Sequence, residues 1–169
     1  EYELVTKNIK HYRIKLPDNK IITIKDAFFS SFSSALSYLK AENIPDNIQF
    51  ATNRFTLEEN IPILFGDDSF KITENEIICG ADIFASAFFM LSRWEEYVIK
   101  DKDNHGRTPD HVQLVFKHNI HYRPVVNEYV EMLRNMFQYF GFKIKNKATF
   151  ELKLTHVVDF FSRYDTFLK

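Results

Sequence analysis

One long amphipathic stretch, Asp82 to Tyr97 (DIFASAFFMLSRWEEY), limits the folds open to this chain more than any other segment. Its apolar residues recur at helical spacing, which predicts one helix whose buried stripe contains Ile83, Ala87, Leu91, Trp94 and Val98. Asp82 is the predicted N-cap, because a side-chain oxygen there accepts the N–H groups that a first turn leaves unpaired. Such a helix would rise roughly 24 Å, less than the ~30 Å hydrocarbon core of a bilayer. We therefore expect a core helix of a soluble domain.

The composition favours one packed domain over disorder. The chain has 169 residues, of which 45% are hydrophobic, with 18 Phe against only 4 Gly, which is enough to bury one core. The net charge of −1 argues against nucleic-acid and membrane partners. The single Cys79 excludes an intramolecular disulfide and favours a reducing compartment, so we expect a cytoplasmic protein. Since the chain opens at Glu1 and not at Met, the true N-terminus and a removed leader stay open.

Short strands are predicted on the N-terminal side of this helix. Alternating apolar and polar residues in 12–16 and 21–24, joined by the turn Pro17 to Lys20, predict a β-hairpin. Apolar runs bounded by Asn, Pro, Gly and Asp predict further strands at 48–51 and 61–65 and a hairpin from 70 to 78.

Two more helices are predicted. The spacing of apolar residues from Asp26 to Lys40 predicts a helix, although its serines favour an irregular turn as the alternative. The second runs from Val125 to Phe140, with Pro124 at its first position and Gly141 just past its end. A polar loop is expected at 100–111, and a strand at 150–158. Together these elements predict an α+β (mixed α/β) fold, a single compact domain with a sheet of short strands packed against two or three amphipathic helices.

The segment Thr155 to Asp159 (THVVD) resembles the first motif of the polysaccharide deacetylases (NodB-homology, carbohydrate esterase family 4) in the form Thr-His-Asp-Val-Asp. Several earlier stretches resemble an uncharacterised domain that precedes such deacetylases in bacterial, often Bacteroidetes-like, proteins: 61–66, 82–97, 105–107 and 123–129. The resemblance implies an accessory N-terminal domain in 1–148, and the start or a remnant of a deacetylase barrel strand in 149–169.

The resemblance implies that this chain lacks a complete catalytic site. Asp159 matches a metal-binding aspartate, but Val157 occupies the position of the catalytic base, and losing a base costs ~10²–10⁴-fold in rate. The remaining metal ligands of the parent family are expected beyond residue 169, so we expect no cofactor in this chain, although a divalent metal belongs to the parent family. One carboxylate does not make a metal site. Taken by itself, Asp159 is a residue at a strand end or a helix cap.

Charged and polar residues gather at the predicted ends of two helices and in the loop between them: Arg93, Trp94, Glu95, Glu96, Arg107, Arg123, Asn127 and Glu128. One interpretation is a network of ion pairs that pins the loop to the helix ends. The other is a polar groove for a sugar or another small ligand, with Trp94, Tyr97 or Tyr122 as a stacking platform. The histidines of the loop region, His118 and His121 among them, are expected at the surface or in hydrogen bonds and not on a metal.

Three hypotheses about function follow. The leading one is a non-catalytic accessory domain of a polysaccharide-deacetylase-like protein, linked to the processing of cell-surface polysaccharide. The alternative is a self-contained carbohydrate-binding, small-ligand-binding or scaffold module, and the least favoured is an active metal-dependent hydrolase. The expected partners are a polysaccharide or a following deacetylase domain. A homodimer is a further candidate partner, because a C-terminal strand without its barrel would expose an open edge that another copy could pair with.

Overall fold

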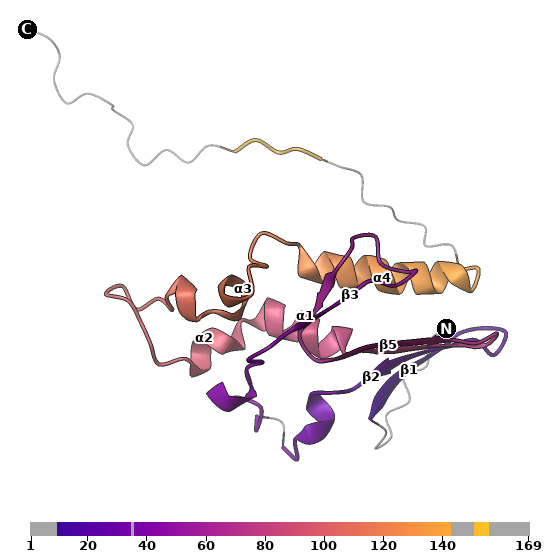
Figure 1. Ribbon diagram of the computed structural model, residues 1–169, viewed down its shortest axis with the longest axis horizontal. Coiled ribbons are helices and arrows are strands. Elements are labelled where there is room, and N and C mark those ends of the chain that lie inside the picture. Colours follow the sequence, from indigo (N-terminus) through magenta and orange to yellow (C-terminus); the bar gives the residue numbers. More distant parts are fainter. Residues whose placement is uncertain (1–9, 35, 143–150, 156–169) are drawn as a thin grey trace, which may run out of the picture.

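Two β-sheets and a set of helices make up the structure (Figure 1), so the predicted mixed α+β class is confirmed. The computed structural model describes residues 10–34, 36–142 and 151–155. The larger sheet has four strands and the smaller one has two. In spatial order the four strands are β1 (His11–Lys15), β2 (Ile21–Lys25), β6 (Glu76–Ala81) and β5 (Gly66–Ile72), and the two are β3 (Gln49–Ala51) and β4 (Ile61–Ile63).

The larger sheet combines both directions of strand pairing. β1 and β2 form the predicted antiparallel hairpin, and β5 and β6 form another, while β2 and β6 run parallel in the centre. The first turn places Asp18 and Asn19 at φ +56°, a region that Asp and Asn tolerate better than most residues. The central strands supply fully buried core side chains, with Ile22 and Ile77 both at 0% exposure.

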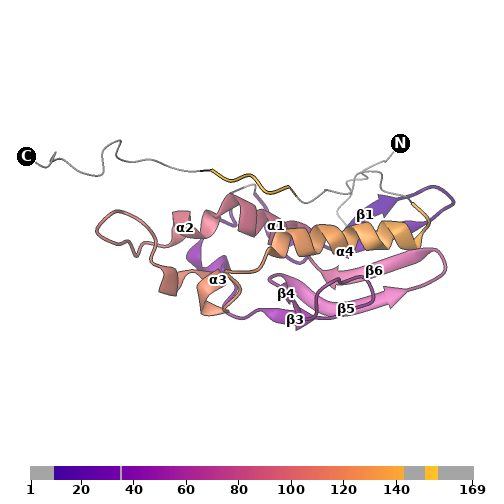
Figure 2. The same cartoon turned by 90° about the horizontal axis from the view of Figure 1, so that it is seen from above.

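The helices cover one side of this sheet and extend beyond it (Figures 1 and 2). α1 and α4 pack against each other, while α2 and α3 lie at the end of the molecule away from the β1–β2 turn. The α-helices are α1 (Ile83–Ser92), α2 (Trp94–Val98), α3 (Leu114–Lys117) and α4 (Val125–Tyr139), and the 3₁₀ helices are η1 (Phe29–Ser31), η2 (Ala41–Asn43) and η3 (Asp110–Val112). None of the helices in the described ranges is long and apolar enough to span a membrane.

The single helix predicted from Asp82 to Tyr97 is two helices. Arg93 has φ +51° in the left-handed region, which ends α1 and starts α2 in a new direction. The predicted buried stripe holds only in part, because a single helical phase does not continue across this break: Ile83 and Trp94 are buried, and Ala87 and Val98 are partly buried. The buried residues of α1 are Ile83, Ala85, Ser86 and Phe89, whereas Leu91 is 72% exposed.

The predicted helix from Asp26 to Lys40 does not form. Within the described residues this stretch holds only η1 and turns, so the irregular alternative is the observed one. Asp26 still caps a turn, since its Oδ1 accepts a hydrogen bond from the Ser30 N–H at 3.0 Å. Asp and Ser side chains both compete for backbone hydrogen bonds, which lowers the helix propensity of the stretch. The aromatic side chains of the stretch pack in a cluster that includes Trp94: Phe28, Phe29, Phe32 and Tyr38.

α4 forms as predicted, one residue shorter, with Pro124 as its N-cap and not its first residue. Its end is a Schellman motif: Phe142 N–H donates to the Phe137 carbonyl and Gly141 N–H to the Gln138 carbonyl, with Gly141 at φ +85°. The strand predicted at 150–158 falls largely outside the described residues, and 151–155, the described part, has no strand. Val157 and Asp159 also lie outside the described residues.

Candidate functional site

A two-pronged ion pair fixes the start of α4. Arg123 Nε and Nη2 donate to the two carboxylate oxygens of Glu128, at 3.0 and 2.9 Å. The third guanidinium nitrogen, Nη1, donates to the Asn60 carbonyl at 2.6 Å. Both side chains are largely enclosed, with 16% of Arg123 and 7% of Glu128 exposed. Glu128 also lies in the first turn of α4, where the helix dipole favours a negative charge. The pair is therefore held in one geometry and joins α4 to the loop that ends at Asn60.

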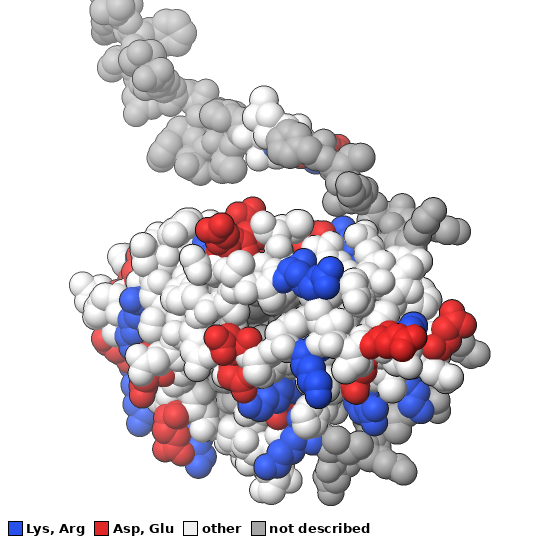
Figure 3. Space-filling model, turned by 45° about the vertical axis from the view of Figure 1, so that its right-hand side comes forward, with Lys and Arg blue, Asp and Glu red and all other residues white. Residues whose placement is uncertain are grey.

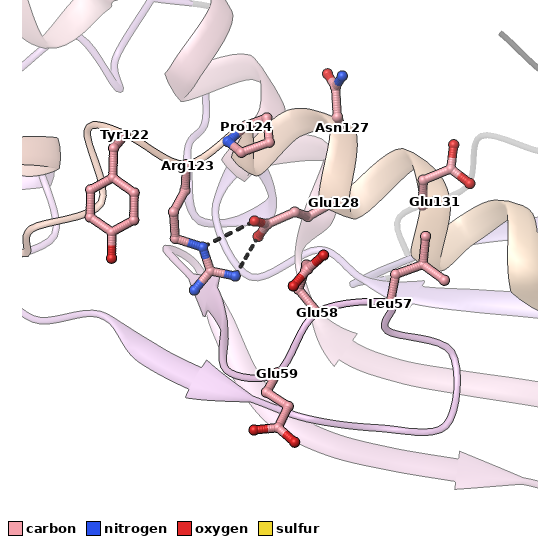
Figure 4. A pocket seen from close by; sticks show the side chains of 9 residues that line it. All are labelled: Leu57, Glu58, Glu59, Tyr122, Arg123, Pro124, Asn127, Glu128 and Glu131. Atoms are coloured by element: carbon pink, nitrogen blue, oxygen red, sulfur yellow. Dashed lines mark hydrogen bonds and ion pairs between the residues drawn. The ribbon is translucent and has the colours of Figure 1, made fainter. Parts of the chain in front are cut away.

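This ion pair forms part of the wall of the first cavity, which has a volume of about 520 Å³ (Figure 4). The loop before β4, the segment before α4 and the first turns of α4 converge here. Figure 4 shows Arg123 turned toward Glu128, with Tyr122 on one side of the pair and Leu57 and Glu58 on the other. Tyr122 is 70% exposed. The full lining is Leu57, Glu58, Glu59, Tyr122, Arg123, Pro124, Asn127, Glu128 and Glu131.

A second cavity of about 800 Å³ lies between α2 and the loop that follows it. Asp103 organises this loop, because its Oδ1 accepts hydrogen bonds from the N–H groups of His105 and Arg107 at 2.8 and 2.9 Å. The hydrogen bond from the Arg107 backbone is the main cause that lowers the pKa of Asp103. Lys102 Nζ bridges to α2, donating to the Glu96 carbonyl and to Thr108 Oγ1. The lining comprises Arg93, Glu96, Tyr97, Lys102, Asp103, Gly106, Arg107, Thr108, Pro109, Asp110 and Gln113.

A third, smaller cavity of about 210 Å³ shares part of its lining with the second. Arg93, Glu96 and Gln113 line both of them. His121 also lines the third cavity, and its ring is stacked on that of Phe116, with centroids 4.5 Å apart and planes 11° from parallel. The residues of the third cavity are Phe89, Met90, Arg93, Glu95, Glu96, Gln113, Val115 and His121.

The eight predicted site residues do not line one common cavity. Arg123, Asn127 and Glu128 line the first cavity. A second set lines the second cavity: Arg93, Glu96 and Arg107. Glu95 is buried under the helices, where its Oε1 accepts the Leu114 N–H at 2.5 Å, and burial raises its pKa. The charged predictions are thus distributed over separate cavities, with Glu95 serving as a cap of α3.

Trp94 is a core residue and not a surface platform. It is 4% exposed, stacked on Phe28 and in edge contact with Phe89. Its Nε1 meets no hydrogen-bond acceptor in the described part of the chain. The two tyrosines named beside it are exposed, Tyr97 at 80% and Tyr122 at 70%. The sequence predicts Trp94 both in the buried stripe and, in the groove hypothesis, on a stacking platform, because Trp suits both roles; the aromatic cluster confirms the buried one.

The ion pairs that the predicted site residues form are local ones. Arg93 pairs with Glu96, Arg107 with Asp103 and Arg123 with Glu128, each within one short segment. These pairs stiffen their own segments. The bridge from the loop after α2 back to α2 comes from Lys102, which sequence reasoning did not single out. Glu58 and Glu59 were also missed, because no motif marks them and their loop reaches α4 only through tertiary contacts such as the Arg123–Asn60 and Asn135–Phe55 hydrogen bonds.

Among the described residues no group of three or more His, Cys, Asp or Glu side chains is placed to hold a metal ion. On the face drawn in Figure 3, acidic and basic side chains are interspersed, as the net charge of −1 leads one to expect. The lining of the first cavity is more acidic, with Glu58, Glu59, Glu128 and Glu131 against the single basic residue Arg123.

Comparison with known families places the chain. Residues 2–141 match DUF7033, a family of unknown function. The chain belongs to this family. The DUF7033 match covers every helix and strand described above and all three cavities, and it ends at Gly141, just past the end of α4. No match was found among curated proteins or among solved structures.

Proposed function

We propose that this DUF7033 domain is a non-catalytic accessory domain that binds carbohydrate at the first cavity. The observation that carries the proposal is the enclosed Arg123–Glu128 pair beside the 70% exposed ring of Tyr122. Sugars offer hydroxyl groups around the ring edge and C–H groups on its faces. A cavity that combines oriented polar groups with one exposed aromatic ring matches both features.

The polar side of the cavity is arranged before any ligand arrives. Both Glu128 oxygens are engaged by Arg123, so this wall is rigid and little side-chain entropy is lost on binding. Glu58 and Glu59 are exposed at the rim, and neither makes an ion pair with another described residue. Their carboxylates are free to accept hydrogen bonds from sugar hydroxyl groups.

The polymer and the parent protein are suggested by the motif at Thr155 to Asp159. Its resemblance to polysaccharide deacetylases supports a protein that acts on an N-acetylated cell-surface polysaccharide. In such a protein this domain would hold the polymer while a following domain carries out hydrolysis. We assign no catalytic residue to the chain, since Val157 stands at the position of the base.

Calorimetric titration with N-acetylglucosamine oligomers tests this proposal. We expect the full chain to bind, and Tyr122→Ala to weaken binding by roughly tenfold, equivalent to about 1.4 kcal/mol. Tyr122→Phe keeps the ring and should bind like the parent chain. Leu91→Ala, which truncates an exposed residue of α1 outside the three cavities, is the matched surface control. Binding that is absent for every oligomer, or unchanged in Tyr122→Ala, would contradict the proposal.

A further inference from the structure

The three cavities adjoin one another along one path. The second and third share Arg93, Glu96 and Gln113 in their linings. The third and first are joined by neighbouring residues, because His121 lines the third and Tyr122 lines the first. The rings of these two residues are in edge contact, with centroids 5.6 Å apart. The linings of successive cavities are therefore connected, the second and third by shared residues and the third and first by the contact between His121 and Tyr122.

Exposed rings stand along the whole path. Tyr122 is at the first cavity, His121 at the third and Tyr97 at the second. Tyr97 is 80% exposed, more than a tyrosine that serves only to fill a core. Several stacking platforms along one groove suit a ligand built as a chain of ring-shaped units better than a ligand with a single ring.

The charge along the path limits the kind of chain. Acidic side chains outnumber basic ones in the combined linings; the three arginines, Arg93, Arg107 and Arg123, are each paired with a carboxylate, and Lys102 donates to the Glu96 carbonyl and to Thr108. A polyanion such as a nucleic acid or a polyuronate would meet more repulsion than attraction here. A neutral or amine-bearing polymer meets no such barrier.

We infer that the three cavities are successive subsites for one linear, uncharged or amine-bearing polysaccharide, entering beside Tyr122 and leaving beside Tyr97. This inference rests on the proposed function, because it extends the carbohydrate site at the first cavity. It makes the α2–α3 end of the domain, including the Asp103 loop, part of the binding surface. The ligand is then a polymer chain several sugars long.

The dependence of affinity on ligand length tests the inference. Calorimetry with the full chain uses N-acetylglucosamine and its β-1,4 oligomers up to the hexasaccharide, and the cello-oligosaccharides as a series without acetyl groups. We expect affinity to rise with length in at least one series. Tyr97→Ala should weaken binding of the hexasaccharide by roughly tenfold and leave the disaccharide unchanged, whereas Tyr97→Phe should restore the long-chain affinity. Arg107→Ala tests the same distal cavity. Urea unfolding of each variant establishes that it is folded.

The outcomes separate this inference from the proposed function. If short oligomers bind and Tyr122→Ala weakens them, but affinity does not rise with length or Tyr97→Ala has no effect on the hexasaccharide, the path is wrong while the carbohydrate site stands. If no oligomer of either series binds, both fail. Tight binding of single-stranded DNA or polygalacturonate in place of the neutral oligomers would overturn the argument from charge.

Discussion

The carboxylate of Asp82 accepts a hydrogen bond from the backbone N–H of Ala27 at 2.8 Å, although the two residues are 55 positions apart. The same oxygen accepts the Phe28 N–H, and the other oxygen caps α1 by accepting the Ala85 N–H at 2.9 Å. Asp82 is fully buried. One side chain therefore both starts α1 and fixes the irregular segment after β2.

We expect Asp82→Ala to lower the free energy of unfolding by about 3 kcal/mol, because it removes a helix cap and leaves buried N–H groups without an acceptor. Urea denaturation measures this loss. Asp26→Ala is the comparison variant, since Asp26 caps an exposed turn and contacts the Tyr12 hydroxyl, and its removal should cost less, about 1 kcal/mol. Equal losses for the two variants would contradict the role assigned to Asp82.

Gly66 and Gly141 share a positive φ but differ in the space around them. A Cβ at Gly66 would lie 2.2 Å from the Gly80 carbonyl oxygen and 2.8 Å from the Asp82 nitrogen, both backbone atoms, whereas nothing lies within 4 Å of one at Gly141. Gly141→Ala should therefore cost about 1 kcal/mol from backbone strain alone. Gly66→Ala should cost at least about 3 kcal/mol, since backbone must move as well. Thermal and urea unfolding of the pair should show this order, and a reversal would mean that the β5–β6 contact is looser than described.

The stability of the domain should fall in acid partly through Asp67. The hydrogen bond from Lys25 Nζ, followed by that from Ser69, lowers the pKa of Asp67 from 3.8 to about 2. A carboxyl group whose pKa is lower in the folded protein stabilises it above pH 3.8, and this contribution is lost as the pH falls toward 2. The Asp67 side chain is 34% exposed, so solvent screening limits the effect to about 1 kcal/mol.

Asp67→Asn should accordingly lose less stability than the parent chain between pH ~4 and ~2. Unfolding curves recorded across that window test the difference in slope. Asp68→Asn changes an exposed neighbour and is expected to follow the parent chain. Identical acid limbs for Asp67→Asn and the parent would show that the Lys25 contact does not hold in solution.

Arg93 carries backbone strain at the junction of α1 and α2. Its φ of +51° is costly for a residue with a Cβ and free for glycine. We expect Arg93→Gly to be more stable than Arg93→Ala by about 1 kcal/mol, while both lose the ion pair to Glu96. Comparing the two variants by urea unfolding cancels the loss of that ion pair. If alanine were the more stable, α1 and α2 would be one continuous helix in solution, as the sequence alone predicts.

Local signals in the sequence were sufficient for several elements. The hairpin around Asp18 and Asn19, the cap at Asp82 and the end of α4 at Gly141 all depend on residues that are neighbours along the chain. Their turn and capping preferences act without help from the rest of the fold. The overall α+β class follows from the same information, since the period of apolar residues separates strands from helices.

Long-range packing decided the rest. Nothing in the sequence around Arg93 signals a left-handed residue there, whereas in the fold the break accompanies the packing of Trp94 against Phe28 and Phe89. The residue types of the candidate site were predictable, but their distribution over several cavities was not. Ion pairs can be proposed between any charged residues until the distances between their side chains are known. Side-chain chemistry and local periodicity are properties of the chain itself. The cavities around Arg107 and Arg123 instead arise from contacts between segments far apart in sequence, and the free energies of these contacts depend on the whole packed structure.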